Sequence, residues 1–132
     1  MHLLRHLFGK RDESLGARGE RAAEQFLKHR GFRVLERNLE VGDDEADLIA
    51  LDPDGRTVVI VEVKTRTDDG IAPEESVHAV KQHRLTRLAM NLMKLERFRD
   101  RPFRFDAVAV VWQRDQRAPQ IRHIPGAFES RW

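Results

Sequence analysis

Three charged side chains interrupt two otherwise apolar stretches of the sequence, and their types suit the hydrolysis of a phosphodiester. Glu62 and Lys64 lie near the end of the run TVVIVEVKT, residues 57–65, and Asp47 lies near the start of the run ADLIAL, residues 46–51. A carboxylate near a core is costly to desolvate unless it is paired or bound to a metal. Two carboxylates can hold a hard divalent ion, Mg²⁺ or Mn²⁺, and an adjacent lysine can position or help deprotonate a water molecule.

The spacing predicts that Asp47 and Glu62 face each other on neighbouring antiparallel strands. If residues 53–56 form a four-residue hairpin loop, the register places Asp47 opposite Glu62 and Glu45 opposite Lys64. Cβ atoms directly opposite in such a pair are about 4.5–5.5 Å apart, and like charges there are destabilising. We therefore expect a cation between the two carboxylates, and an ion pair between Glu45 and Lys64 in the metal-free protein.

An alternative interpretation of these residues is an ion-pair ladder at the solvated end of an ordinary sheet. Asp47 and Glu62 alone are compatible with it, because the register is an assumption. Lys64 favours the catalytic interpretation. Only five of the 24 basic residues are lysines, and a lysine pKa can be shifted by its surroundings whereas an arginine stays charged.

The elements that would position these side chains follow from the hydrophobic periodicity. The order is a helix, three strands, a helix and one or two strands. This order predicts an α/β (α+β) domain with a mixed sheet and helices against its faces. The expected helices cover residues 14–30, ended by Gly31, and Val77 to Leu95, after a loop over 66–75. The expected strands cover residues 32–41, 46–51, 57–65, 105–112 and, as a short fifth strand, 120–124.

Length and composition narrow the class of protein. The 132 residues suffice for one domain, which we place at 14–124, between a basic N-terminal arm, 1–13, and a C-terminal tail, 125–132. Hydrophobic residues make up 40% of the chain, which excludes a disordered protein. No apolar run approaches the ~20 residues of a membrane-spanning helix. The absence of cysteine excludes thiolate chemistry and is compatible with a cytoplasmic location.

Ordered motifs along most of the chain resemble a known family. Asp47 followed by Glu62-Val63-Lys64 resembles the motif of the PD-(D/E)XK nuclease superfamily, whose core has the order αβββαβ. The wider set resembles the YraN family, a group of uncharacterised bacterial proteins similar to archaeal Holliday junction resolvases. One departure is Asp44, where the family usually has glycine. The matching motifs are Gly16–Glu20 with Ala23, Gly31, Asn38, Glu45–Ala50, Val61–Arg66, Lys81 and Arg104–Asp106.

The resemblance implies a restriction-endonuclease-like fold, a bound Mg²⁺ or Mn²⁺, and roles for individual residues. Asp47, Glu62 and Lys64 would be catalytic, with Glu45 in support. By analogy with resolvases, a homodimer is also implied. The implied metal ligands are Glu20, Asp47, Glu62 and the backbone carbonyl of Val63, and the implied nucleic-acid contacts are Lys81, Arg66 and Arg84.

Other residue types in the sequence admit more than one interpretation. Gly16 and Gly19 leave room for a phosphate or for a neighbouring element. Trp112 and Trp132 can stack on bases, although a tryptophan in a core or an interface is the ordinary case. No pair of histidines has a spacing typical of metal ligands.

Three functions are compatible with this pattern. The first is a metal-dependent endonuclease that hydrolyses DNA, with branched DNA as one candidate substrate. The second is a nucleic-acid-binding module that keeps the nuclease fold without turnover. The third is an RNA-processing nuclease, because carboxylates at a sheet edge do not distinguish sugars.

Overall fold

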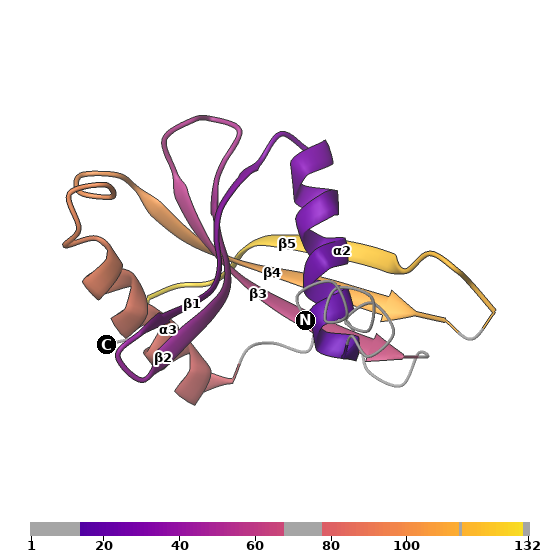
Figure 1. The fold of residues 1–132 in the computed structure, drawn as a ribbon. Helices are drawn as coiled ribbons and strands as arrows, with labels where there is room; N and C mark the ends of the chain where they lie inside the picture. The colour runs from indigo at the N-terminus through magenta and orange to yellow at the C-terminus, as the bar shows by residue number, and fades with distance from the viewer. Residues whose placement is uncertain (1–13, 68–77, 114, 131–132) are drawn as a thin grey trace, which may run out of the picture.

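The structure is a computed structural model, and it describes residues 14–67, 78–113 and 115–130. It forms one mixed sheet of five strands with a helix on each face, in the order predicted (Figure 1). The predicted basic arm 1–13, residues 68–77 and Trp132 lie outside the described residues. The elements are α2 (Leu15–His29), β1 (Arg33–Val41), β2 (Asp44–Leu51), β3 (Val58–Thr67), α3 (Ala79–Leu92), β4 (Phe103–Trp112) and β5 (Gln120–Phe128).

The strands lie in the sheet in the order of the sequence, β1-β2-β3-β4-β5. Tight turns join β1 to β2 and β2 to β3, and both pairs are antiparallel. A crossover through α3 brings β4 alongside β3 in parallel, and β5 returns antiparallel to β4. The mixed sheet predicted from the sequence is therefore confirmed.

The first helix begins and ends as its sequence predicts. The Ser14 side chain accepts a hydrogen bond from Ala17 N at 3.1 Å and caps the N-terminus. Ala23 and Leu27 are buried against the sheet. Gly31 follows the helix with φ at +91°, a conformation that glycine adopts without the steric cost of a side chain.

Strand β3 is the centre of the molecule because both of its faces are covered. Val58 and Ile60 belong to an apolar cluster with the buried leucines of α3. Val59 and Val61 belong to a second cluster, on the α2 side. All four residues are at most 1% exposed, so their transfer from water contributes strongly to folding. Figure 1 shows α2 crossing β3 and β4 while α3 lies beside the β1–β2 hairpin.

Several boundaries differ from the sequence-based prediction. Strand β3 continues to Thr67, so Arg66 lies in the strand and not in the predicted loop. Strand β5 runs to Phe128 and not only to residue 124, because Phe128 stacks on Phe105 of β4 at 4.5 Å between ring centroids. Val80 and Leu95 lie within the helix predicted over Val77 to Leu95 from its hydrophobic periodicity, yet they are 65% and 53% exposed. The buried stripe of α3 starts only at Gln82, and Leu95 lies beyond the helix end.

Neither of the two described helices has the length and apolar character needed to span a membrane.

Candidate active site

The candidate site lies where β2 separates from β3. The predicted register is confirmed over four pairs, from Leu51 opposite Val58 to Leu48 opposite Val61. Past that point, the backbone N–H of Val63 donates a 2.7 Å hydrogen bond to Asp47 Oδ2. In a continued antiparallel ladder this donor would meet a backbone carbonyl of β2. A side-chain carboxylate therefore takes the place of a backbone acceptor, and the two strands diverge around it (Figure 1).

Asp47 lies close enough to Glu62 in this fork to act on its carboxyl group. Glu62 is 13% exposed. Burial, together with the adjacent Asp47, raises the pKa of Glu62 to about 8. In the absence of a cation, the pair therefore holds a proton near neutral pH. That the two carboxylates share an ion stays a prediction.

Lys81 of α3 supplies a positive charge to the pair. Its Nζ lies 3.5 Å from Glu62 Oε2. This attraction lowers the pKa of Glu62, but burial and Asp47 outweigh it. Lys81, for which the family resemblance implies a contact with nucleic acid, therefore forms an ion pair with one of the two carboxylates.

Glu20 approaches the same fork from α2, on the other face of the sheet. Its pKa is raised by partial burial and by the charge of Asp47, and its side chain is hydrogen-bonded to Asn38. Asn38 has a positive φ of 48° in β1, an uncommon conformation for a residue with a side chain. The irregular backbone of β1 at Asn38 therefore lies beside Glu20 of α2.

Gly19 is the residue that allows α2 to lie so close to β3. A Cβ at position 19 would lie 1.8 Å from Thr65 Oγ1 and 2.8 Å from Thr65 Cβ. Of the two roles that the sequence left open, contact with a neighbouring element is the one observed here. A Cβ at Gly16 would meet nothing closer than Ser14 Oγ at 4.0 Å.

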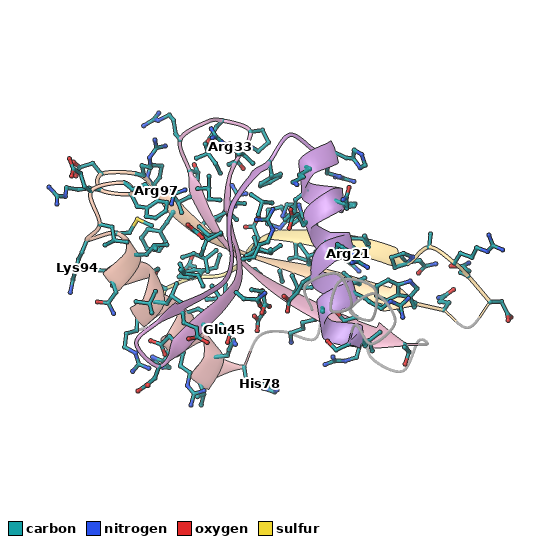
Figure 2. The ribbon with its side chains drawn as sticks, in the orientation of Figure 1. Arg21, Arg33, Glu45, His78, Lys94 and Arg97 are labelled. Atoms are coloured by element: carbon teal, nitrogen blue, oxygen red, sulfur yellow. The ribbon has the colours of Figure 1, made fainter. Side chains whose placement is uncertain are left out.

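The predicted partnership between Glu45 and Lys64 stays a prediction. Glu45 is paired across β1 with Glu40, and it belongs to the hairpin arm that leaves β3, where Figure 2 labels it. Lys64 shares the α3-side face of β3 with Glu62, since alternate residues of a strand point the same way. Arg66 donates to its neighbouring Thr65 carbonyl at 2.8 Å. Arg84 is exposed on α3, and its charge lowers the pKa of Asp44.

The donor set in the fork is chemically suited to a divalent cation. Within residues 14–67, 78–113 and 115–130, no three acidic or histidine side chains are gathered closely enough to hold a metal ion as they stand. Two carboxylates that share a proton are nevertheless a fit for one hard cation, because a cation can replace that proton and relieve their repulsion. Glu20 would join them only by turning away from Asn38.

A second buried acid, Asp106 of β4, received no role from the sequence beyond its place in a motif. It is fully buried and binds Arg104 Nε at 2.7 Å, His123 Nε2 at 2.7 Å and the Gly126 backbone N–H at 3.0 Å. Arg104 also binds Asp52 at the β2–β3 turn, at 2.9 Å. The signal that could have revealed this cluster is an acid inside the apolar run FDAVAVVW, two residues after an arginine on the same strand face.

Asp44 is the position at which the chain departs from the family pattern. It is 4% exposed and forms a two-pronged ion pair with Arg87 of α3, at 2.6 and 2.7 Å. A glycine there could not make this contact. The Asp44–Arg87 ion pair therefore joins the β1–β2 hairpin to α3.

Comparisons with known proteins agree with the motifs. The family model described as "Uncharacterised protein family UPF0102" matches residues 19–110. A UPF0102 protein of Geotalea uraniireducens is 41% identical over 89% of this chain and 91% of its own length. One from Geobacter metallireducens is 37% identical over 89% and 94%, and one from Rhodopirellula baltica is 40% identical over 93% and 76%. The chain therefore belongs to the UPF0102 family, which is the YraN family that its sequence motifs resemble.

Proposed function

We propose that this protein is a divalent-metal-dependent endonuclease of the PD-(D/E)XK type that hydrolyses phosphodiesters in DNA. The observation that carries the proposal is the contact between Asp47 and Glu62 in the fork between β2 and β3. Lys64 follows two residues after Glu62 on the same strand face. A structural role alone gives no reason for two acids to face each other in a half-buried place.

The arrangement of the strands supports the nuclease-type core. A helix, three antiparallel strands, a crossover helix and a parallel strand follow one another as in the αβββαβ order. The acids lie on the second and third strands, and the first helix adds Glu20.

In the proposed reaction, water attacks a phosphorus atom, the bond to one sugar oxygen breaks, and the products carry a phosphate and a hydroxyl. A divalent ion, when bound, polarises the phosphoryl oxygen and lowers the pKa of water. Asp47 and Glu62 would hold that ion, and Glu20 and the Val63 carbonyl would complete its ligands. Lys64 would position the attacking water or stabilise the negative charge that develops on the phosphate. Lys81, once released from Glu62, would contact a phosphate together with Arg66 and Arg84.

The test is a cleavage panel of linear, flapped and four-way DNA with Mn²⁺, run beside RNA of the same sequence. We expect cut DNA with the wild-type protein and none with Asp47→Asn or Lys64→Ala. Glu96→Gln, which changes an exposed acid beyond α3, serves as the matched control and should cut normally. A preference for RNA would indicate an RNA-processing nuclease. Binding to DNA without any cut product would reduce the protein to a nucleic-acid-binding module.

A further inference from the structure

A second pocket, away from the carboxylates, has the composition of a nucleotide site. It has a volume of about 260 Å³ and lies between α2 and the β4–β5 connection. Three arginines line it, and no acid is among the described residues of its wall. Its lining includes Arg18, Arg21, Gln25, Trp112, Arg117 and Pro119.

Within this pocket, an arginine and a tryptophan are stacked. The Arg18 guanidinium lies 4.7 Å from the centroid of the Trp112 ring, which is within the range of a cation–π contact. Stacked aromatic and guanidinium groups are the surfaces on which unpaired bases lie in proteins that bind single strands. Arginine forks also match the geometry of a phosphate group.

The pocket is connected to the candidate active site through α2. Arg18, Arg21 and Gln25 recur at helical spacing and therefore form one face of the helix. Arg21, which Figure 2 labels on the β4 and β5 side of α2, also lines the cavity that contains Glu20 and Asn38. The cavity beside Glu20 and Asn38 is also lined by Arg37, which donates a hydrogen bond to Glu24.

The register of the sheet gives the scale of this connection. Trp112 is paired with Thr67 at the end of β3, five residues after Glu62. At ~3.3 Å per residue this separation is about 16 Å along the strand, and Trp112 lies on the α2 side of the sheet whereas Glu62 lies on the α3 side.

We propose that Arg18, Arg21, Trp112 and Arg117 form a single-strand track, which binds an unpaired stretch of the substrate that continues beyond the bond to be cut. One base would stack in the Arg18–Trp112 pocket, and Arg21 and Arg117 would contact its phosphates. A pocket smaller than the roughly 300–1,000 Å³ that encloses a whole small ligand suits one nucleotide of a longer chain. The assignment to this substrate class rests on the proposed function, and the track implies that the substrate carries a single-stranded segment, with DNA or RNA sugar.

The first test reads Trp112 directly and needs no cleavage. Trp132→Phe leaves Trp112 as the sole tryptophan. In EDTA, we expect a twelve-nucleotide oligo(dT) or oligo(U) to quench Trp112 fluorescence, and a duplex or inorganic polyphosphate of equal charge to quench it much less. Equal quenching by polyphosphate would overturn the proposal, because it would show an arginine patch without base recognition.

Two variants test the stacking of a base on Trp112 and the contact of Arg117 with a phosphate separately. Trp112→Leu keeps an apolar side chain and should weaken binding of a labelled oligo(dT) by roughly 5- to 150-fold, the range for one stacked base. Arg117→Gln changes an exposed residue and should reduce the salt slope of binding by about 0.7. Arg99→Gln, an exposed arginine in the segment after α3, is the matched control. If Trp112→Leu fails to fold, the salt slope of Arg117→Gln is the deciding measurement. Identical salt slopes for Arg117→Gln and Arg99→Gln would overturn the proposed track.

The two proposals can fail independently. Mn²⁺-dependent cleavage without Trp112 quenching would overturn the track and leave the nuclease standing. Quenching without cleavage would support the track and remove the proposed hydrolysis.

Discussion

Two acids lie in adjacent central strands, Asp106 fully buried and Glu62 13% exposed, and their surroundings are opposite in kind. Asp106 of β4 meets Arg104, His123 and a backbone N–H. Burial raises its pKa, but these hydrogen bonds outweigh burial and bring the pKa below the ordinary value. Glu62 of β3 meets another acid, and burial and Asp47 raise its pKa to about 8.

This difference separates an acid whose charge is paired within the fold from the acid that we propose as a metal ligand. The cluster around Asp106 ties β4 to β5 and, through Arg104, to the β2–β3 turn. Its charges are paired within the protein. At the Asp47–Glu62 pair, the charge of Lys81, 3.5 Å from Glu62, is outweighed by burial and by Asp47. Further positive charge is what a divalent cation would supply.

The largest expected effect comes from removing the charge of Asp106. Asp106→Asn removes the anion that Arg104 and His123 both bind and leaves Arg104 with Asp52, and breaking such a buried pair costs about 3–5 kcal/mol of unfolding free energy. The measurement is urea denaturation at pH 7. Asp47→Asn is the comparison, and we expect it to leave the metal-free protein equally or more stable, because it removes a repulsion. Similar losses for both variants would erase the distinction between the two acids.

Metal-linked stability is the next effect in size. A ligand that binds only the folded protein, at one hundred times its dissociation constant, stabilises it by about 2.7 kcal/mol. Mn²⁺ should therefore raise the melting temperature of the wild-type protein, and Asp47→Asn should abolish the rise. Thermal melts of both proteins, with Glu96→Gln as the control, measure this. An equal rise in the Asp47→Asn protein would place the bound metal elsewhere.

Close packing at Gly19 should matter more than at Gly16, although both lie near the start of α2. Gly19→Ala forces its Cβ against Thr65, and overpacking of this kind typically costs about 1–3 kcal/mol. Gly16→Ala has open space and should gain roughly 0.5–1 kcal/mol, because alanine favours the helix. Denaturation midpoints of the two variants give the comparison. Because Glu20 follows Gly19, the Mn²⁺-induced rise in melting temperature should also shrink in Gly19→Ala only.

The pH dependence of stability gives the sharpest contrast between the two acids. The raised pKa of Glu62 means that the folded protein binds an extra proton between about pH 4.5 and 8. Stability therefore falls as the pH rises through this window, with a slope of at most ~1.4 kcal/mol per pH unit. Asp106 has the opposite sign, since its lowered pKa contributes stability above its ordinary pKa of 3.8 that is lost on further acidification.

Glu62→Gln isolates the first of these two contributions. In EDTA, unfolding free energies measured at pH 5, 6, 7 and 8 should decline less steeply in the variant than in the wild-type protein. Parallel curves for the two proteins would mean that Glu62 titrates as an ordinary exposed acid.

Much of the fold could be predicted from local patterns. The β-branched run at residues 57–65 predicted the central strand, and the turn at 53–56 predicted a register that the structure confirms from Leu51 to Leu48. Gly31 predicted the end of the first helix. These features depend on neighbours in the sequence, so the sequence is enough. The end of β5 could not be predicted, because it depends on Phe128 meeting Phe105 from a distant part of the chain.

For the candidate site, the sequence by itself determined the residue types and the spacing that make Asp47, Glu62 and Lys64 candidates. Only the tertiary structure decided what surrounds them. The divergence of β2 from β3, the approach of Glu20 past Gly19 and the position of Lys81 all join segments far apart in the chain. Asp106 gives the same lesson, because an acid in an apolar strand can be a binding site or a structural ion pair. Its role depends on which charges the folded chain brings to it, and Arg104 and His123 are brought there by packing.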